Sequence, residues 1–401
     1  MTTHKIIRDS VYGNIRIADL FLELLHRPEL QRLHGIRQLG LTYLVYPGAN
    51  HTRLEHSLGT CHVARRMAAS LDLGRQEQKN VGVAALLHDI GHGPFSHTLE
   101  RLLHQATGDD HMELTREMIA GQRTLDDIDA EPLPALLRQH DINPADIVAI
   151  LSGQRDHLSD IIHGPIDADQ IDYLRRDAHY TGVAYGVIDF DRLVQTMTLH
   201  DGHVMVHKKG VSALESMLVA RSLMYSSVYL HKTVRIAELM LLRAVEHAMP
   251  FDFSPLTDGE LLHRLRREGT FQRDIVRRVK YRRLFKSAFR RDLADMNPEE
   301  RRHLAELDTE AAEQSIAEKA DLDRGYVIVD VPGRDVLLSE PRLKQMDVPI
   351  LDDGSAAPLS DYTPLVNALQ LRGVTDWGVM VICPEDARSR VAGIAPEVLL
   401  G

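Results

Sequence analysis

LLHDIGHGPFSH, residues 86–97, is the stretch of this 401-residue sequence that decides its fold. It closes an almost wholly apolar run, VGVAALLHD (81–89), and a helix that is apolar on all sides is normally buried. Two glycines and a proline follow directly, and they must end that helix. The sequence therefore predicts a buried helix that carries His88 and Asp89 into the core of the protein.

A buried His-Asp pair predicts a site for a divalent metal ion. A carboxylate inside an apolar core is costly unless it is paired or bound to a metal, and the adjacent imidazole offers a nitrogen ligand. Two further ligands are expected. The best candidates are His56 in TRLEHSLG (52–59) and Asp169 in PIDADQIDYLRRD (165–177), both within helical patterns.

A plainer interpretation of each residue stays open at this point. A His-Asp pair occurs by chance in many proteins, Asp169 also suits the N-cap of a helix, and His56 suits a hydrogen-bonded core position. Gly91 and Gly93 on either side of His92 favour a site, because they suggest a backbone exposed to a ligand. A metal site is the hypothesis that accounts for these residues together.

Helical periodicity dominates the remaining sequence. It predicts helices over residues 15–40, 54–73 and 211–249, the last as one helix or two. Residues 196–208 alternate in hydrophobicity around an Asp-Gly pair, which predicts a β-hairpin.

The second part of the chain is predicted to be a smaller lobe. Strand-like segments at 321–331 and 377–383 mix with helical ones there, and residues 250–255 form a natural boundary. We therefore expect a mainly α protein with two domains. An all-helical core with one short β-hairpin occupies residues 1–250, and an α+β lobe that serves oligomer or regulatory contacts occupies residues 251–401.

Composition limits the class of protein. Hydrophobic residues make up 44% and charged residues 26% of the chain, which is ordinary for a globular protein. No stretch approaches the roughly 18 apolar residues of a membrane span, no secretory signal is evident, and two cysteines are too few for a disulfide scaffold. These features predict a cytoplasmic protein with no membrane partner. The net charge of −11 argues against a nucleic-acid-coating surface, despite a local basic run at 277–291.

Five stretches together resemble one family, the HD-domain deoxynucleoside triphosphate triphosphohydrolases, which include bacterial dGTPases and the animal sterile-alpha-motif/HD enzyme. The stretches are QRLHGIRQLG (31–40), YPGANHTRLEHSLG (46–59), LLHDIGHGPFSHTLE (86–100), DADQIDYLRRDAHYTG (167–182) and RSLMYSSVYLHK (221–232). Their order and approximate spacing agree with the family over most of the first 250 residues. The resemblance implies an all-helical HD catalytic core that hydrolyses a deoxynucleoside triphosphate to deoxynucleoside and triphosphate.

The same resemblance assigns roles to individual residues. Four residues match the ligands of one divalent metal ion: His56, His88, Asp89 and Asp169. These residue types do not distinguish among Zn, Fe, Mn, Mg and Ni as the metal. Those that match positions of the chemical step are His92, His111 and Arg53. Those that match substrate positions are Gln38, Leu39, Arg53, His97, Tyr173, Asp177, Arg221 and Tyr229. Of these, Gln38 and Leu39 match the positions that meet the deoxyribose.

Two departures from the family pattern bear on phosphate binding and regulation. Gln170 stands where the animal enzyme has a lysine beside the last metal ligand, which removes one charge directed at phosphate. His26 and His34 stand where the activator site of that enzyme uses Asp and Arg to recognise guanine, although Gln31 is kept. A nucleotide activator other than GTP, or constitutive activity, is equally open.

Two other functions also remain open from the sequence. A nucleotidase or phosphodiesterase would keep the metal site and act on other nucleotides. A nucleotide-sensing or nucleic-acid-binding protein with little turnover would use the basic run at 277–291. The resemblance and the long helical pattern at 211–249 further imply a homo-oligomer, a dimer or a tetramer.

Overall fold

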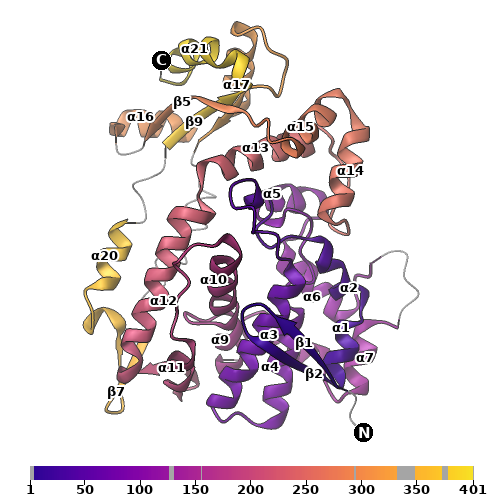
Figure 1. The fold of residues 1–401 in the computed structure, drawn as a ribbon, viewed down its shortest axis with the longest axis vertical. Coiled ribbons are helices and arrows are strands. Elements are labelled where there is room, and N and C mark those ends of the chain that lie inside the picture. The colour runs from indigo at the N-terminus through magenta and orange to yellow at the C-terminus, as the bar shows by residue number, and fades with distance from the viewer. Residues whose placement is uncertain are drawn as a thin grey trace. The chain divides into compact units, whose positions relative to one another are not determined.

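Helices dominate the computed structural model, as the sequence predicts (Figure 1). It describes residues 4–125, 131–154, 156–292, 295–331, 348–372 and 378–400. The chain forms two compact units, and each is discontinuous in sequence. The first takes the described residues of Met1–Tyr229, Phe251–Leu261 and Met346–Val366, and the second those of Leu230–Pro250, Leu262–Gln345 and Asn367–Gly401. The sequence predicts two domains that meet at residue 250, whereas each compact unit contains residues from both sides of that position. The domain boundary itself stays a prediction.

The first unit is built around long helices. Its helices are α1 (Leu20–Leu25), α2 (Pro28–Gln31), α3 (Arg53–Ser70), α4 (Arg75–Leu87), α5 (Ser96–Thr107), α6 (His111–Ala120), α7 (Leu133–Gln139), α8 (Pro144–Leu151), α9 (Asp156–His163), α10 (Ala168–Thr181), α11 (Phe190–Gln195) and α12 (Val211–Met224). α3 packs against α4 and α10 (Figure 1). α4 also packs against α8 and α9. The apolar run of α4 is buried from Val81 to Leu87, which confirms the prediction of a buried helix.

Small sheets flank these helices. β1 (His4–Asp9) and β2 (Gly13–Ala18) form an antiparallel hairpin. β3 (Met197–His200) and β4 (His203–His207) form the hairpin predicted over 196–208. β7 (Pro349–Asp352) and β8 (Ser355–Pro358) extend that second hairpin into a four-stranded sheet, in which only β4 and β7 run parallel.

Local sequence signals fix where the central helices begin. The Glu55 side chain accepts a hydrogen bond of 2.7 Å from the backbone N–H of Thr52, which precedes α3. Asp167 caps α10 by accepting from the backbone N–H of Gln170 at 2.7 Å. Such caps satisfy N–H groups that have no partner within the helix.

The helix predicted over residues 15–40 is wrong at its start. Residues 13–18 form β2, because their backbone pairs with β1 from His4 opposite Ala18 to Asp9 opposite Gly13. Helix begins only at α1, and Pro28 then opens the separate helix α2. The pattern over 211–249 proves to be two helices, α12 and α13 (Lys232–Glu246), with a π-helical turn at Tyr225–Tyr229 between them.

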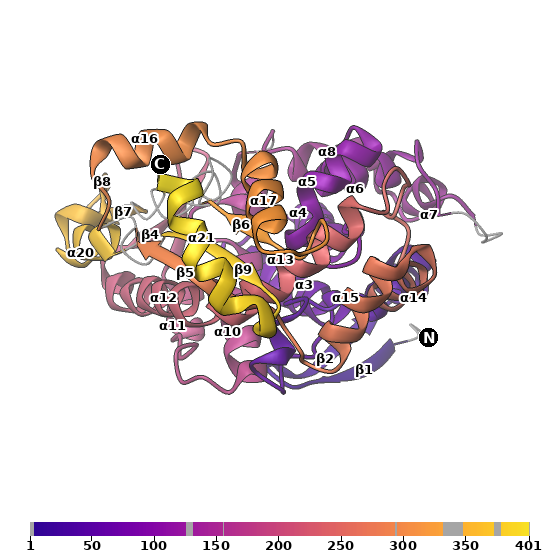
Figure 2. The same cartoon turned by 90° about the horizontal axis from the view of Figure 1, so that it is seen from above.

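The second unit combines helices with a three-stranded antiparallel sheet. The strand order is β5 (Lys286–Asp292), β9 (Gly378–Cys383) and β6 (Ile328–Asp330). The strand-like segment predicted at 377–383 is confirmed for residues 378–383, while Trp377 lies outside the described residues. Of the segment predicted at 321–331, only residues 328–330 form a strand, and 321–327 are turns and irregular chain. Its other elements are α13, α15 (Thr270–Lys280), α16 (Pro298–Glu306), α17 (Thr309–Lys319) and α21 (Arg388–Leu400). Two further helices contain residues of both units: α14 (Asp258–Glu268) and α20 (Leu365–Arg372). α21 packs on β5 and β9 (Figure 2).

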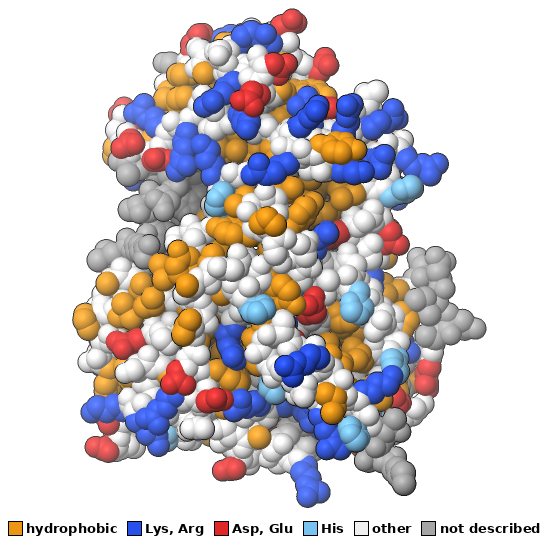
Figure 3. Space-filling model, viewed as in Figure 1, with side chains coloured by type: hydrophobic (Ala, Val, Ile, Leu, Met, Phe, Trp, Pro, Cys, Tyr) orange, Lys and Arg blue, Asp and Glu red, His pale blue; other side chains and the backbone are white. Residues whose placement is uncertain are grey.

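The basic run at 277–291 lies in this second unit. Lys and Arg side chains are numerous on the face of the protein seen in Figure 3, with Asp and Glu side chains among them. Phe285 is 1% exposed and Arg278 is paired with Asp274 at 2.6 Å, whereas Tyr281 is 61% exposed. One aromatic ring of the run is therefore core packing and one of its charges is neutralised, which weakens its case as a nucleic-acid surface.

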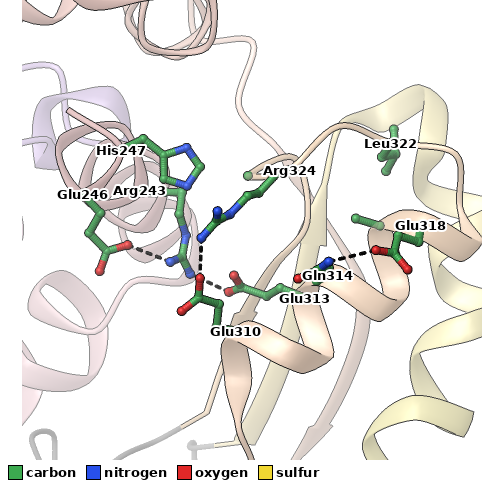
Figure 4. A pocket seen from close by; sticks show the side chains of 11 residues that line it. Arg243, Glu246, His247, Glu310, Glu313, Gln314, Glu318, Leu322 and Arg324 are labelled. Carbon is green, nitrogen blue, oxygen red and sulfur yellow. Dashed lines mark hydrogen bonds and ion pairs between the residues drawn. The ribbon is translucent and has the colours of Figure 1, made fainter. Parts of the chain in front are cut away.

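A cavity of about 430 Å³ also belongs to the second unit, and no predicted site residue lines it (Figure 4). Glu313 of α17 is buried there, 2.5 Å from Arg243 of α13. Burial raises the pKa of Glu313 to about 7, although Arg243 and the N–H of Val329 oppose the shift. The carboxylate form of Glu313 therefore destabilises the fold.

Replacing Glu313 with glutamine is expected to change how stability depends on pH. Between its ordinary pKa of 4.5 and about 7, the folded state holds a proton that the unfolded state has lost, so wild-type stability falls as pH rises through this window. The shift corresponds to at most about 3 kcal/mol. The melting temperature of Glu313→Gln, relative to wild type, should rise between pH 5 and pH 8. Glu318→Gln, at an exposed position on the same helix, is the control, and a flat difference for Glu313→Gln would contradict the prediction.

Candidate metal centre

Three segments of the first unit bring the predicted metal ligands together. His56 projects from α3, His88 and Asp89 follow the last turn of α4, and Asp169 lies in the first turn of α10. His56 Nε2 lies 3.0 Å from Asp169 Oδ1, and His88 Nε2 lies 3.2 Å from Asp89 Oδ1. One donor atom each from His56, His88 and Asp169 lies within 4.8 Å of the others. Asp89 Oδ2 is 3.9 Å from His56 Nε2, so Asp89 borders the same cluster.

A hydrogen bond at Nδ1 of each imidazole orients His56 and His88 so that Nε2 can bind a cation. His56 Nδ1 lies 2.8 Å from Asp172 Oδ2, and His88 Nδ1 lies 2.8 Å from the carbonyl oxygen of Ala85. Both partners are acceptors, so Nδ1 carries the proton and Nε2 of the neutral ring offers its lone pair. His88 Nε2 is buried and makes no hydrogen bond with any described residue. This donor set fits a divalent metal ion.

Charges in the cluster compensate one another in the metal-free protein. Burial opposes a charge on His56, but hydrogen bonds with Asp169 and Asp172 outweigh it and raise the pKa of His56 to about 10. Burial likewise favours the neutral form of Asp89, yet the adjacent histidines and the Arg53 guanidinium hold the pKa of that carboxyl well below its usual range. A proton and a divalent ion would therefore compete for His56 Nε2, so metal binding should release a proton.

Gly59 lets α10 approach α3 closely behind His56. A Cβ atom at position 59 would lie 1.9 Å from Asp172 Oδ1 and 2.3 Å from Arg176 Nη2, well inside contact distance. These two side chains are fully buried and have no room to retreat. The glycine that ends the TRLEHSLG motif is therefore needed for packing around the metal ligand.

Gly59→Ala is expected to destabilise the protein by at least about 1–3 kcal/mol, the usual cost of overpacking a core. It should also weaken metal binding, because Asp172 holds the ring of His56. Urea unfolding measures the first effect, and metal titration measures the second. Gly259→Ala is the matched control, since an added Cβ there meets nothing within 4 Å. If the two variants were equally stable, α3 and α10 would have to move apart around the added Cβ at position 59 without loss of stability, which would contradict the prediction.

His111 lies beside the cluster and is held by a carboxylate. Its Nδ1 is 2.7 Å from Glu100 Oε1, which also accepts the backbone N–H of His111 at 3.1 Å. Burial favours the neutral form of Glu100, but the bonds with His111 outweigh it and lower the pKa of this carboxyl. Glu100 is therefore an ionised acceptor that orients the His111 ring.

His92 stacks on His111, with ring centroids 3.9 Å apart and planes 13° apart. Its Nδ1 lies 2.5 Å from Ser96 Oγ and its Nε2 lies 3.2 Å from Asp89 Oδ1, so both ring nitrogens have partners. Burial and the nearby Arg53 guanidinium lower the pKa of His92 well below its usual value. In the metal-free protein, His92 is thus a neutral ring that orients groups around it.

Several predicted substrate residues carry buried polar atoms that lack a hydrogen-bond partner among the described residues. These atoms are Gln38 Oε1, Arg53 Nε, Tyr173 Oη, and Nε and Nη2 of Arg221. Buried polar groups are nearly always paired in folded proteins, and an unpaired one costs about 1–3 kcal/mol. Unpaired donors on two buried guanidiniums point to an anionic ligand that pairs with them.

The remaining predicted substrate residues differ in their hydrogen-bond partners and in their exposure. Both carboxylate oxygens of Asp177 are engaged, one 2.7 Å from His51 Nε2 and one by the Tyr229 hydroxyl at 2.7 Å. His97 is exposed, with its Nε2 3.4 Å from Arg53 Nη2, and Leu39 is half-buried. The substrate and catalytic assignments of these residues stay predictions.

The turn between α4 and α5 differs from the sequence-based interpretation. Gly91 and Gly93 are buried, and a Cβ at position 91 would lie 2.3 Å from the carbonyl oxygen of His111. Gly91 therefore allows close packing against α6, and the expectation that both glycines expose the backbone to a ligand is wrong. Asp258 holds this turn, since its carboxylate accepts the N–H of Phe95, whose φ of 47° is left-handed.

The positions that depart from the family pattern lie in two settings. Gln170 is buried, and its Nε2 donates to Asp167 Oδ2 at 2.8 Å, so its amide is used within α10. His26 and His34 are both exposed. Among the described residues, neither histidine contacts the proposed metal ligands.

Sequence reasoning missed three residues that support the site: Glu100, Asp172 and His51. Glu100 follows His97 at a spacing of three on α5, which places both on one helix face and was the available signal. Asp172 follows Asp169 at the same spacing on α10. His51 carries no such signal, because its partner Asp177 lies 126 residues away.

A helical core in which two histidines and two aspartates converge at a His-Asp pair defines a metal-site protein of the HD type. The HD domain family matches residues 53–177, and the HD associated region matches residues 188–400. An uncharacterized protein of Methanocaldococcus jannaschii is 34% identical over 95% of this chain and 80% of its own length. The chain belongs to the HD-domain phosphohydrolase family.

Further relatives carry more specific names. The deoxynucleoside triphosphate triphosphohydrolase SAMHD1 homolog of Dictyostelium discoideum is 30% identical over 70% of this chain, which spans 59% of that protein. A solved phosphohydrolase of Bacteroides thetaiotaomicron shares the fold with a TM-score of 0.73 and 26% identity, over 96% of this chain and 100% of its own. A hypothetical protein of Aquifex aeolicus gives a TM-score of 0.74 and 29% identity, over 97% and 100%. Among the described residues, no helix is long and apolar enough to cross a membrane.

Proposed function

We propose that this protein hydrolyses deoxynucleoside triphosphates to deoxynucleoside and triphosphate at the metal centre. The observation that carries the proposal is the set of unpaired buried polar atoms on Gln38, Arg53, Tyr173 and Arg221. These residues match the family's substrate positions, and their chemistry suits a ligand with several phosphates and a polar sugar or base. The relative named as a triphosphohydrolase supports the same choice.

The two buried arginines are proposed to hold the phosphates. Arg53 Nη1 is tied to Asp89 Oδ2 at 2.8 Å, which fixes its guanidinium beside the cluster. Arg221 is 2% exposed and lies 5.9 Å from the centre of the Tyr225 ring. A planar guanidinium gives paired, directed hydrogen bonds to phosphate oxygens. Gln38 and Leu39 are proposed to meet the deoxyribose, and a close fit there would exclude a 2′-hydroxyl.

His111 is proposed to give a proton to the leaving 5′-oxygen of the nucleoside. A divalent ion, when bound, lowers the pKa of its water and neutralises phosphate charge. The leaving alkoxide then needs a proton, and we assign its donation to His111, whose ring is held at Nδ1 by the Glu100 carboxylate. The arrangement of Glu100 and His111 orients the ring as the aspartate does in a Ser-His-Asp triad.

Product analysis tests the proposal directly. Purified protein loaded with Mn²⁺ would be incubated with each of the four dNTPs, with and without a second nucleotide as activator. We expect a deoxynucleoside and intact triphosphate in equal amounts, with the matching ribonucleotides turned over far more slowly. In ¹⁸O-labelled water, the label should enter triphosphate and not the deoxynucleoside, because water attacks phosphorus.

Two outcomes would replace the proposal with another function. Release of inorganic phosphate from deoxynucleoside monophosphates, or opening of cyclic nucleotides, would assign a nucleotidase or phosphodiesterase to the same metal centre. Tight nucleotide binding without any product would leave a sensing protein. A homo-oligomer and a cytoplasmic location remain part of the proposal, and light scattering at micromolar concentration tests the first.

A further inference from the structure

A buried row of charged side chains connects the β1–β2 hairpin to the metal ligand His56. Asp172 Oδ2 lies 2.8 Å from His56 Nδ1. Arg176 binds the same carboxylate through two nitrogens, Nε at 2.9 Å and Nη2 at 3.0 Å. Its third nitrogen, Nη1, donates to Asp9 Oδ2 at 2.8 Å. The side chains of Asp172 and Arg176 are 0% exposed, and that of Asp9 is 6% exposed.

Each member of this row depends on the others because water does not reach it. Burial opposes the charge on Arg176, but Asp172 and Asp9 outweigh it and raise the pKa of Arg176. Burial likewise favours the neutral form of Asp172, but Arg176 and His56 hold the pKa of that carboxyl well below its usual range. Removing one partner from a buried ion network leaves an uncompensated charge, which the remaining groups must move to accommodate.

Asp9 reaches this row from a fixed position. Its Oδ1 accepts the backbone N–H groups of Val11 and Tyr12, both at 2.8 Å, and so shapes the turn between β1 and β2. Its Oδ2 is the oxygen that receives Arg176. One carboxylate therefore joins the turn of the hairpin to the guanidinium behind the metal ligand.

We propose that Asp9 is a positioning residue for the metal ligand His56, acting through Arg176 and Asp172. Asp172 Oδ2 is shared between Arg176 Nε and His56 Nδ1, so displacement of the guanidinium moves the acceptor that orients the imidazole. The outer partners of ligating histidines commonly contribute 10–100-fold to metal affinity. This inference rests on the proposed metal centre and is independent of which nucleotide the protein hydrolyses.

Asp9→Asn separates the two roles of this residue. The amide oxygen can still accept the N–H groups of Val11 and Tyr12, while an NH₂ group would face the Arg176 guanidinium, donor against donor. We expect Co²⁺ to bind the metal-free variant about 10-fold more weakly than the wild type. The visible absorption of bound Co²⁺, which reports coordination geometry, should also change. Both readouts are independent of activity.

Ile15→Ala is the matched control for loss of hairpin stability. Ile15 is buried on β2, and its truncation weakens the same hairpin without touching Asp9 Oδ2. The proposal requires Ile15→Ala, at an equal or larger loss in melting temperature, to keep wild-type Co²⁺ affinity and spectrum. Equal losses of affinity in both variants would overturn it, and so would wild-type affinity and spectrum in Asp9→Asn.

A double-mutant cycle with Asp172→Asn tests the route. If Asp9 acts through Asp172, adding Asp9→Asn to Asp172→Asn should weaken Co²⁺ binding by less than the roughly 10-fold effect seen alone. Full additivity would overturn the route. A wild-type protein that binds no Co²⁺ would overturn the metal centre and this inference together. A protein that binds Co²⁺ normally but hydrolyses no dNTP would refute only the proposed substrate.

Discussion

His88→Ala is expected to lose bound metal and to lower kcat by at least about 1,000-fold, or about 4 kcal/mol of transition-state stabilisation. His88 offers a buried Nε2 without a hydrogen-bond partner among the described residues, and its Nδ1 is fixed by the carbonyl of Ala85. Alanine removes the ligand and leaves the helix intact. Elemental analysis of the purified variant gives metal content, and initial rates give the loss of activity.

Thermal unfolding supplies a second measure of the same change. A metal that binds only the folded state stabilises it by about 2.7 kcal/mol at 100 times its dissociation constant. Added metal should therefore raise the melting temperature of the wild type and not that of His88→Ala. His104→Ala is the control, since His104 is exposed on α5. Full metal content in His88→Ala would remove this residue from the ligand set.

His111→Gln is expected to lower kcat about 100- to 10,000-fold while metal content stays at the wild-type level. The bond of His111 to Glu100 orients the imidazole, and glutamine has no group that releases a proton near neutral pH. Glu100→Gln keeps a hydrogen-bond acceptor but removes the negative charge, so we expect a smaller loss. Single-turnover rates at saturating metal measure both variants.

A change of leaving group distinguishes proton donation from loss of shape. p-Nitrophenyl triphosphate releases p-nitrophenolate, which leaves without a proton. If His111 is the acid, the deficit of His111→Gln should largely disappear with this substrate. A deficit of the same size on both substrates would mean that His111 positions phosphate or water instead.

Short-range patterns carried much of the fold prediction. The buried part of α4 was readable because residues 81–87 are apolar on every side, and the β3–β4 hairpin was readable from an Asp-Gly turn. The β1–β2 hairpin was missed although β2 alternates, with Ile15 and Ile17 buried between exposed residues, because the helical spacing that follows was extended back over these residues. β1 shows no such alternation. The stability of the hairpin comes from pairing and from contacts such as Arg176 with Asp9, 167 residues apart in sequence.

The candidate site shows the same limit. His88 and Asp89 are adjacent, and His56 and Asp169 were already candidates from their helical segments before the resemblance matched the same four residues. The structure brings His56 and Asp169 within reach of the pair. The partners that fix the ligands could not be predicted in this way, because Asp172 is one of many helical aspartates until its contact with His56 is seen. Gly91 was misread for a related reason. A glycine needed for close packing and one that exposes backbone look alike in sequence.

Asp9 and Asp258 have a consequence for dividing this chain into pieces. The stretch that matches the HD domain, residues 53–177, contains all four proposed ligands. It lacks the carboxylate behind Arg176, and it lacks Asp258, which accepts the N–H of Phe95 at 3.0 Å and so holds the turn after Asp89. A fragment cut at the family boundaries would keep every ligand and their direct partners Asp172 and Ala85, but it would lose Asp9 and Asp258. If Asp9 positions His56 as proposed, a segment with full metal affinity must include residues 9 to 258.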